Sequence, residues 1–173
     1  MEQLFGPRGA CAGCWCMYWR RTNAEYKKNQ GEGNRRAMKS LIERGIVPGI
    51  LAYDGDTPIG WCSVAPREQF VRFETSRTLK PIDAQPVWSI ACLFVAKGYR
   101  RKGISAQLLE AAAAYARSQG AKILEGYPRD PSKQEADPFL WTGTVPAFVK
   151  AGFTEMARPS ETRAIMRREL RRK

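Results

Sequence analysis

A short, strongly basic turn between two regular segments is the part of this sequence best suited to chemistry. The turn spans residues 96–103, and its four cations are Lys97, Arg100, Arg101 and Lys102. Where such a turn opens a helix, the first backbone N–H groups have no intrahelical partner, and the helix dipole adds partial positive charge. Gly103 has no Cβ, so the backbone there can approach a ligand closely. These features predict a phosphate or pyrophosphate site, and a solvated basic loop is the alternative.

The segments on either side of the turn have the patterns needed to hold it in place. Residues 87–95 are mostly apolar and β-branched and are long enough for a buried strand. Residues 105–119 carry apolar side chains at helical spacing, with Ser105 predicted as the N-cap and Gly120 as the glycine that follows the last turn. We therefore expect a strand, the basic turn and a helix in direct succession.

The stretch LFVAKGYRRKGISAQLL, residues 93–109, resembles the acetyl-CoA motif of the GNAT superfamily of N-acetyltransferases. The signature of that family is Arg/Gln-x-x-Gly-x-Gly/Ala at the start of a helix that follows a strand. Here it reads Arg100-x-x-Gly103-x-Ser105. Serine departs from the usual Gly or Ala but is still small, so we expect the pyrophosphate to fit. The Gly-Lys-Ser/Thr ending of a Walker A loop and the three spaced glycines of a dinucleotide fingerprint are both missing.

The resemblance implies where acetyl-CoA, the expected co-substrate, would bind. Backbone groups at the end of the strand would hold the pantetheine arm and place the thioester carbonyl, while the turn would hold the pyrophosphate. The residues assigned to this cofactor site are Leu93, Phe94, Val95, Arg100, Arg101, Lys102, Gly103, Ile104 and Ser105. No metal is expected. The sequence has no histidine, which excludes a Ser–His or Cys–His catalytic pair and any His-ligated metal site.

Acetyl transfer to an amine needs a group that takes the amine proton and an acid that protonates the leaving thiolate. The segment FVKAGF, residues 148–153, resembles the late GNAT element Tyr-x-x-x-Gly-Phe, whose tyrosine is often the acid. Phe148 stands at that position here and has no proton to give. Tyr127 is therefore the candidate acid and Glu125 the candidate base, since alternate residues of a strand point to the same side. A partly buried aromatic side chain is the alternative interpretation of Tyr127.

The order of the predicted elements resembles the GNAT architecture as well. An Asp-Gly turn between two apolar runs is a strong hairpin signal, and it joins the first two strands. The predicted helices are residues 15–29, 35–44, 105–119 and 147–151, with Asn34 as the cap of the second. The predicted strands are residues 47–53, 59–64, 87–95, 121–127, 153–157 and 163–170. Residues 129–138 are predicted as a loop. The resemblance implies an α/β fold with a central mixed sheet and helices on both faces.

Composition limits the class of protein. Hydrophobic residues make up 43% and charged residues 27%, which is typical of a globular chain, and residues 1–173 are predicted as one domain. No apolar run could cross a bilayer and no secretory pattern is visible, so we expect a cytoplasmic protein. The net charge of +12 favours anionic partners, and CoA would account for part of it. A nucleic-acid-associated protein is an alternative, although aromatic residues do not interleave with the basic clusters.

Three cysteines lie within six positions of the N-terminal region, in the segment CAGCWC of residues 11–16. They can be buried thiols packed against the nearby aromatic residues, half of a zinc site, or a redox pair. The second Cys-x-x-Cys of a zinc site is missing, which favours packing. In GNAT enzymes this part of the chain often forms a wall or lid near the substrate pocket. We therefore expect this segment, together with residues 67–82, to choose the acceptor.

The resemblance implies an N-acetyltransferase that moves the acetyl group of acetyl-CoA to a primary amine by direct attack. The acceptor is left open between a small molecule and a protein amine, and a homodimer is one assembly that the sequence allows. Because Phe148 replaces the usual tyrosine, a catalytically degenerate module that binds or senses CoA is the alternative function.

Overall fold

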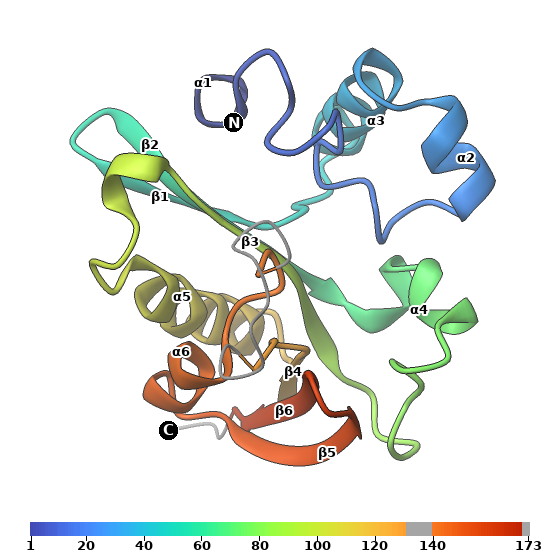
Figure 1. Cartoon of the computed structure of the whole chain (residues 1–173), viewed down its shortest axis with the longest axis vertical. Helices are drawn as coiled ribbons and strands as arrows, with labels where there is room; N and C mark the ends of the chain where they lie inside the picture. Colours follow the sequence, from blue (N-terminus) through green and yellow to red (C-terminus); the bar gives the residue numbers. More distant parts are fainter. Residues whose placement is uncertain (131–139, 171–173) are drawn as a thin grey trace.

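The computed structural model describes residues 1–130 and 140–170 and is built on one six-stranded sheet with the order β1-β2-β3-β4-β6-β5 (Figure 1). The strands are β1 (Ile50–Asp54), β2 (Thr57–Pro66), β3 (Trp88–Val95), β4 (Ile123–Gly126), β5 (Thr154–Ser160) and β6 (Arg163–Glu169). β3 and β4 are parallel and all other neighbours are antiparallel, which makes the sheet mixed, as predicted. The loop predicted for residues 129–138 lies, from residue 131 on, outside the described residues.

Helices cover both faces of this sheet (Figure 1). They are α1 (Glu2–Phe5), α2 (Asn23–Lys28), α3 (Glu32–Glu43), α4 (Arg72–Thr75), α5 (Ile104–Ser118) and α6 (Val145–Lys150), with 3-10 turns at Arg67–Gln69 and Lys97–Tyr99. α5 and α6 share one buried cluster with β2, β3 and β4. The N-terminal segment packs on the opposite face of β2 through Phe5, Trp15 and Met38, which contact Trp61. The predicted fold class is confirmed.

α5 lies close to the sheet because its buried face is built mainly from alanine and leucine. Leu108, Leu109, Ala112, Ala113 and Ala116 are all nearly inaccessible to solvent. They recur at helical spacing and form one apolar stripe. This agrees with the predicted helix, but the predicted cap was wrong. The helix begins one residue earlier than expected because the preceding glycine adopts a left-handed conformation and takes the N-cap position.

The β3 strand contains an irregularity that shapes the site. Val64 pairs with Ile90 and Ser63 pairs with Cys92, so Ala91 is an extra residue on β3 without a partner on β2. A bulge of this kind bends the strand and re-aims the side chains that follow it. Ile90 remains in the cluster under α5, whereas Cys92 packs with the N-terminal segment on the other face.

β3 and β4 separate soon after they begin to pair. Their pairing is limited to Trp88–Ile90 of β3 and Leu124–Gly126 of β4. Further along β3, the N–H of Leu93 donates instead to the carbonyl of Trp141, at 2.7 Å. The loop that carries Trp141 therefore takes the place of a partner strand at the end of β3.

The N-terminal region is less regular than the sequence indicates. The predicted helix over residues 15–29 is limited to α2, which begins after Thr22, where Thr22 and Glu25 form a reciprocal capping box. The predicted cap Asn34 lies inside α3 instead, and its buried amide donates to the carbonyl of Gly13 while its oxygen accepts from Arg21. Residues 67–82 contain only short helical turns.

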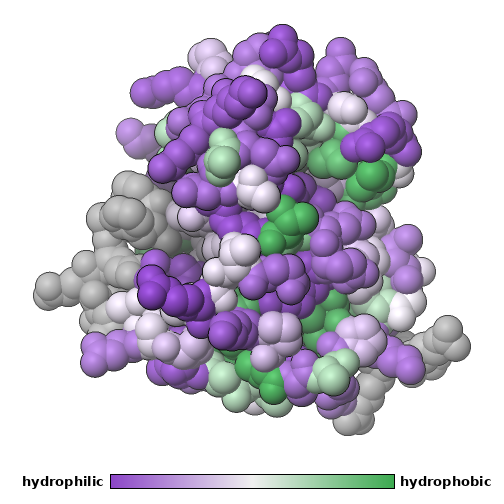
Figure 2. Space-filling model, turned by 90° about the vertical axis from the view of Figure 1, so that its right-hand side faces the viewer, coloured by the Kyte–Doolittle hydropathy of each residue, from purple (hydrophilic) through white to green (hydrophobic). Residues whose placement is uncertain are grey.

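Hydrophilic side chains dominate the face that Figure 2 shows, and apolar side chains are exposed there only as separate small patches. Within residues 1–130 and 140–170, no helix has the length and apolar character needed to cross a membrane.

Candidate active site

The start of α5 presents a row of free backbone donors. Gly103 and Arg101 have φ values of 81° and 61°, both left-handed. The first N–H groups bonded inside the helix are those of Ala106 and Gln107, which reach the carbonyl of Gly103 at 3.0 and 3.2 Å. Within the described part of the chain, the N–H groups of residues 101–105 have no acceptor. A Cβ added at Gly103 would meet no atom within 4 Å, so this side of the turn is open. Five free donors beside arginine side chains form a site suited to a phosphate group.

The basic turn is tied to the end of β3. The side-chain Nε of Arg100 donates to the carbonyl of Val95 at 3.1 Å, and the N–H of Ala96 donates to Ile59 of β2 at 2.9 Å. Because N–H directions alternate along a strand, Leu93 and Val95 present theirs to the side away from β2. The anion-binding turn and the open edge of β3 are therefore continuous.

A cavity of about 400 Å³ extends along this edge. It is lined by Ala10, Cys11, Leu93, Phe94, Val95, Arg100, Arg101, Ser105, Leu140, Trp141, Gly143 and Thr144. Six of the nine residues predicted to hold acetyl-CoA are among them. Of the other three, the Lys102 amine lies 5.3 Å from the Tyr99 ring, Ile104 packs against the core under α5, and Gly103 caps the helix. The structure thus gathers most of the predicted site around one cavity.

A second, smaller cavity of about 190 Å³ adjoins the first. The two share Ala10, Cys11, Leu93, Phe94 and Trp141. The second is further lined by Ala12, Cys14, Cys16, Tyr18, Trp19, Tyr26, Ser63, Ala91 and Cys92. Most of these belong to the N-terminal segment that the sequence indicated as a wall of the substrate site. Tyr26 and Trp141 were not anticipated. The predicted helix over residues 15–29 did not indicate which of its side chains would face a cavity, and the loop after residue 139 gives no periodic signal.

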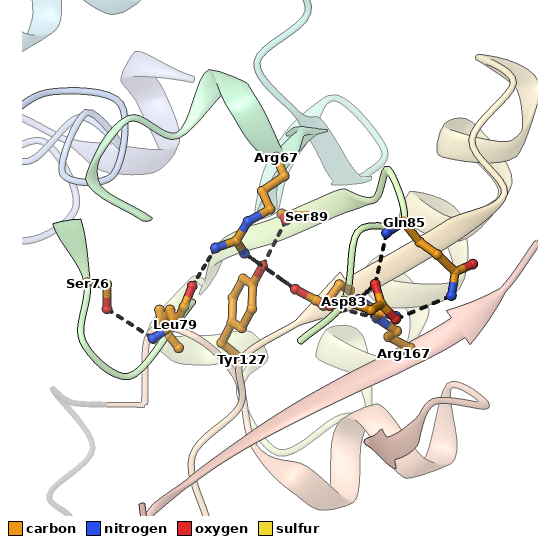
Figure 3. Close-up of polar contacts among 9 residues, drawn as sticks. Arg67, Ser76, Leu79, Asp83, Gln85, Ser89, Tyr127 and Arg167 are labelled. Carbon is orange, nitrogen blue, oxygen red and sulfur yellow. Dashed lines mark hydrogen bonds and ion pairs between the residues drawn. The ribbon is translucent and has the colours of Figure 1, made fainter. Parts of the chain in front are cut away.

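The candidate base and acid lie together, but in a buried network, in which Figure 3 labels Tyr127 with its partners Arg67 and Ser89. The carboxylate of Glu125, which is 1% exposed, pairs with Arg67 at 3.4 Å and with Arg167 at 2.7 Å. The hydroxyl of Tyr127 donates to Glu125 at 2.7 Å, accepts from Arg67 at 2.5 Å and shares a 2.9 Å hydrogen bond with Ser89. Burial and the nearby carboxylate raise the pKa of Tyr127 well above its ordinary value. Neither Glu125 nor Tyr127 lines the two cavities.

The same network extends to the chain between α4 and β3. Arg167 also binds Asp83 through both terminal nitrogens, at 2.5 and 3.1 Å, and Arg67 donates to the carbonyl of Leu79 (Figure 3). Both oxygens of Glu125 are engaged by cations, so this geometry suits a group that fixes neighbouring segments in place.

Phe148 occupies a core position. It is fully buried, and its ring packs on Phe153 with 4.9 Å between centroids. The ring lies directly against two glycines: a Cβ added at Gly126 would be 2.1 Å from it, and a Cβ added at Gly143 would be 2.8 Å from it. The position that resembles the family's acid is therefore closed to solvent and to both cavities.

The five cysteines are all free thiols. The sulfur of Cys16 accepts from the indole nitrogen of Trp61 at 3.0 Å and lies 3.7 Å from the sulfur of Cys92. Contact with Cys16 and burial raise the pKa of Cys14, and burial raises that of Cys62, so these thiols stay protonated at neutral pH. Among the described residues, no group of three or more Cys, Asp or Glu side chains is placed to hold a metal ion. The packing interpretation fits this arrangement best.

Comparison with known proteins identifies the family. The model of the Acetyltransferase (GNAT) family matches residues 14–138, well over half of the sequence. The chain belongs to the GNAT acetyltransferase family. No protein among the curated sequences matches this GNAT chain.

Solved structures of GNAT proteins share its fold. An N-acetyltransferase from Staphylococcus aureus Mu50 superposes with a TM-score of 0.55 at 14% identity, over 87% of this chain and 85% of that one. The yncA protein of Salmonella typhimurium, solved with its cofactor acetyl-CoA, superposes with a TM-score of 0.53 at 14% identity. The match covers 96% of this chain and 91% of that one. A GNAT acetyltransferase from Streptococcus pneumoniae superposes with a TM-score of 0.51 at 14% identity, over 79% of this chain and 76% of that one. At these identities the likeness extends to the fold alone.

Proposed function

We propose that this GNAT protein is an N-acetyltransferase that moves the acetyl group of acetyl-CoA to a primary amine. The observation that carries the proposal is the row of free N–H groups over residues 101–105, which opens into a cavity along the edge of β3. A pyrophosphate bound there would accept hydrogen bonds from the backbone N–H groups. It would also be attracted by the positive end of the α5 dipole and by the charged side chains of Arg100 and Arg101. The yncA structure with bound acetyl-CoA supports the choice of donor.

The pantetheine arm would run along Leu93, Phe94 and Val95 toward the second cavity. The N–H of Leu93 is already bonded to Trp141, so an arm that pairs with this edge has to share or replace that bond. The thioester would then lie where the two cavities share Leu93, Phe94 and Trp141. This is where an amine held in the second cavity could reach it.

In the transfer, the amine nitrogen forms a bond to the thioester carbonyl carbon and the carbon–sulfur bond breaks. The products are an amide and CoA, and the proton lost by the amine balances the proton gained by the thiolate. Holding the two reactants side by side removes much of the entropic barrier. We assign Glu125 and Tyr127 a positioning role, because both are engaged inside the buried network.

Two measurements on the same preparation test the proposal. Calorimetry should show binding of acetyl-CoA, and a thiol-release assay should show free CoA when a panel of primary amines is added. No acetyl-CoA binding at millimolar concentration would refute the cofactor assignment. Binding without thiol release from any amine would instead favour the CoA-binding or sensing module, which the fully buried Phe148 motivates.

A further inference from the structure

The second cavity has a chemistry that limits what it can hold. We propose that it receives the acceptor, and that the acceptor is a small arylalkylamine, one aromatic ring with a short primary-amine arm, bound in its uncharged form. This inference rests on the proposed acetyl transfer and adds the substrate class.

The walls of the cavity are aromatic and uncharged. None of the described residues that line it carries a formal charge. The rings of Tyr18, Trp19, Tyr26 and Trp141 contact one another, with centroids 4.9 Å apart for Tyr18–Trp19, 5.3 Å for Tyr18–Tyr26 and Tyr18–Trp141, and 5.7 Å for Trp19–Trp141. Aromatic rings pack favourably against a further ring in edge-to-face or offset geometry. A polyamine or an amino sugar would find no carboxylate among the described residues that line the cavity, and it would lose its hydration.

The size of the cavity agrees with a single ring. An apolar cavity of about 150 Å³ in another protein is large enough to bind benzene. A volume of about 190 Å³ therefore accommodates one ring with a short arm. Both cavities are lined by Leu93 and Phe94. The amine arm would point toward these two residues and meet the thioester there.

The loop that forms this wall has a strained backbone. Ala10, Ala12, Trp15 and Cys16 all have positive φ values, from 44° to 68°. Residues other than glycine adopt this conformation at a cost, and such residues cluster at ligand-binding and active sites. The loop is nevertheless held firmly, since the N–H of Gly13 donates to the carbonyl of Arg8 and the carbonyl of Gly13 accepts from the N–H of Gly31. This loop lines both cavities. Its strained backbone is therefore consistent with a loop that shapes a binding site.

The uncharged state of the bound amine follows from the lack of formal charge on the described residues that line the cavity. Burial without a counter-ion lowers the pKa of an ammonium group and favours the neutral amine, which is the nucleophile. The titratable groups that face the cavity are the thiols of Cys11, Cys14, Cys16 and Cys92 and the phenols of Tyr18 and Tyr26. Burial raises the pKa of Tyr26 to about 12, and the contact with Cys16, together with burial, raises the pKa of Cys14, so neither supplies an anion at neutral pH. Arg72 stacks at 3.9 Å on Tyr18, one of the lining residues, and its positive charge would also disfavour an ammonium.

The experiment compares phenethylamine with spermidine in the thiol-release assay. Binding is followed in parallel by quenching of tryptophan fluorescence, which does not require turnover. We expect kcat/KM for phenethylamine to exceed that for spermidine by at least about tenfold, the lower end of what a hydrophobic pocket discriminates. Trp19→Ala should lower the phenethylamine value by at least about tenfold, because it removes a wall of this cavity alone.

Trp88→Ala is the matched control, since Trp88 packs on Tyr115 under α5 and lines neither cavity. It should leave the preference for phenethylamine unchanged. Cys14→Leu, which fills the cavity without removing an aromatic ring, should also reduce phenethylamine binding while acetyl-CoA affinity stays at the wild-type value. That affinity reports whether each variant is folded.

The outcomes separate the two proposals. If acetyl-CoA does not bind, the proposed function fails. If acetyl-CoA binds but spermidine is used as well as phenethylamine, or phenethylamine neither quenches fluorescence nor releases thiol, the acceptor inference is overturned and the donor site stands. An unchanged preference in Trp19→Ala would also overturn it.

Discussion

The phenol of Tyr127 donates a 2.7 Å hydrogen bond to the carboxylate of Glu125, and both residues are 1% exposed. The two side chains that the sequence indicates as acid and base are therefore bonded to each other. The same carboxylate also pairs with Arg67 and Arg167, so it lies in a closed set of charge-assisted contacts. Such a set is costly to break, because removing one cation leaves the carboxylate buried and incompletely paired.

Replacing Arg67 by methionine should therefore destabilise the protein strongly. We expect a loss of about 3–5 kcal/mol in the free energy of unfolding, measured by urea denaturation. Arg158→Met is the matched control, since Arg158 pairs with Glu155 and Asp130, and the side chains of Arg158 and Glu155 are 34% and 36% exposed. Its loss should not exceed about 1 kcal/mol. Equal losses in the two variants would contradict a structural role for the buried network.

Gly103 is the N-cap of α5 and Gly120 follows its C-cap, Gln119, and both glycines have a left-handed backbone, with φ values of 81° and 85°. Neither has an atom within 4 Å of an added Cβ. Alanine at either position should therefore cost a similar amount of stability, about 1–2 kcal/mol, from backbone strain. Only Gly103→Ala should also weaken acetyl-CoA binding, by about tenfold or more in calorimetry, which corresponds to ~1.4 kcal/mol. Equal affinities in the two variants would show that the pyrophosphate lies elsewhere.

The acetyl-CoA side of the site could be predicted because the residues that form it lie close together in the sequence. A strand, a basic turn and a helix follow one another, and the signature Arg100-x-x-Gly103 lies entirely within that unit. Even there the cap was placed wrongly at Ser105. Propensity favours serine as an N-cap, but the left-handed backbone at Arg101 and Gly103 lets the helix begin before it.

The acceptor side could not be predicted, because its residues come together only in the folded chain. Trp19 and Trp141 are 5.7 Å apart between ring centroids but are separated by most of the sequence. The segment that carries Cys11 and Cys16 contains residues with left-handed backbone conformation and is neither a regular helix nor a strand. The spacing of its hydrophobic residues therefore does not predict how its backbone folds. Likewise, the alternation that predicts Glu125 and Tyr127 on one side of the strand over residues 121–127 does not reveal that Arg67 and Arg167 pair with Glu125.

Ser105 offers a test in which helix stability and ligand binding change in opposite directions. It is the second residue of α5 and lines the larger cavity. Ser105→Asp places a carboxylate in the first turn, where it should stabilise the helix by about 0.3–1 kcal/mol. The same charge should repel the pyrophosphate and abolish acetyl-CoA binding. Ser105→Ala, which stays small and neutral, should bind nearly as well as the wild type. Retained binding in Ser105→Asp would contradict the assignment of this turn to phosphate.

Phe148→Tyr would restore the side chain that the family often uses as an acid, yet we expect no gain in turnover. The para carbon of the Phe148 ring is 2.7 Å from where a Cβ at Gly126 would lie, so a hydroxyl there would crowd the backbone. The site is fully buried, and the hydroxyl would also need a new hydrogen-bond partner. A loss of about 1–3 kcal/mol in unfolding free energy is expected. A faster thiol release in this variant would show that the position does reach the reacting groups.

The ion pair between Asp83 and Arg167 should make stability depend on pH in the acid range. The hydrogen bonds from Arg167 hold the pKa of Asp83 at about 2, below its ordinary value of 3.8. A carboxyl group whose pKa is lowered on folding stabilises the protein fully above its unfolded pKa, and this contribution is lost as pH falls toward the folded pKa. The difference in unfolding free energy between wild type and Asp83→Asn should therefore be constant near neutral pH and shrink between 3.8 and about 2. Urea denaturation across this range measures it, and because the Asp83 side chain is 37% exposed, added salt should reduce the difference. A difference that persisted unchanged at the acid end would mean that this pair does not lower the pKa of Asp83.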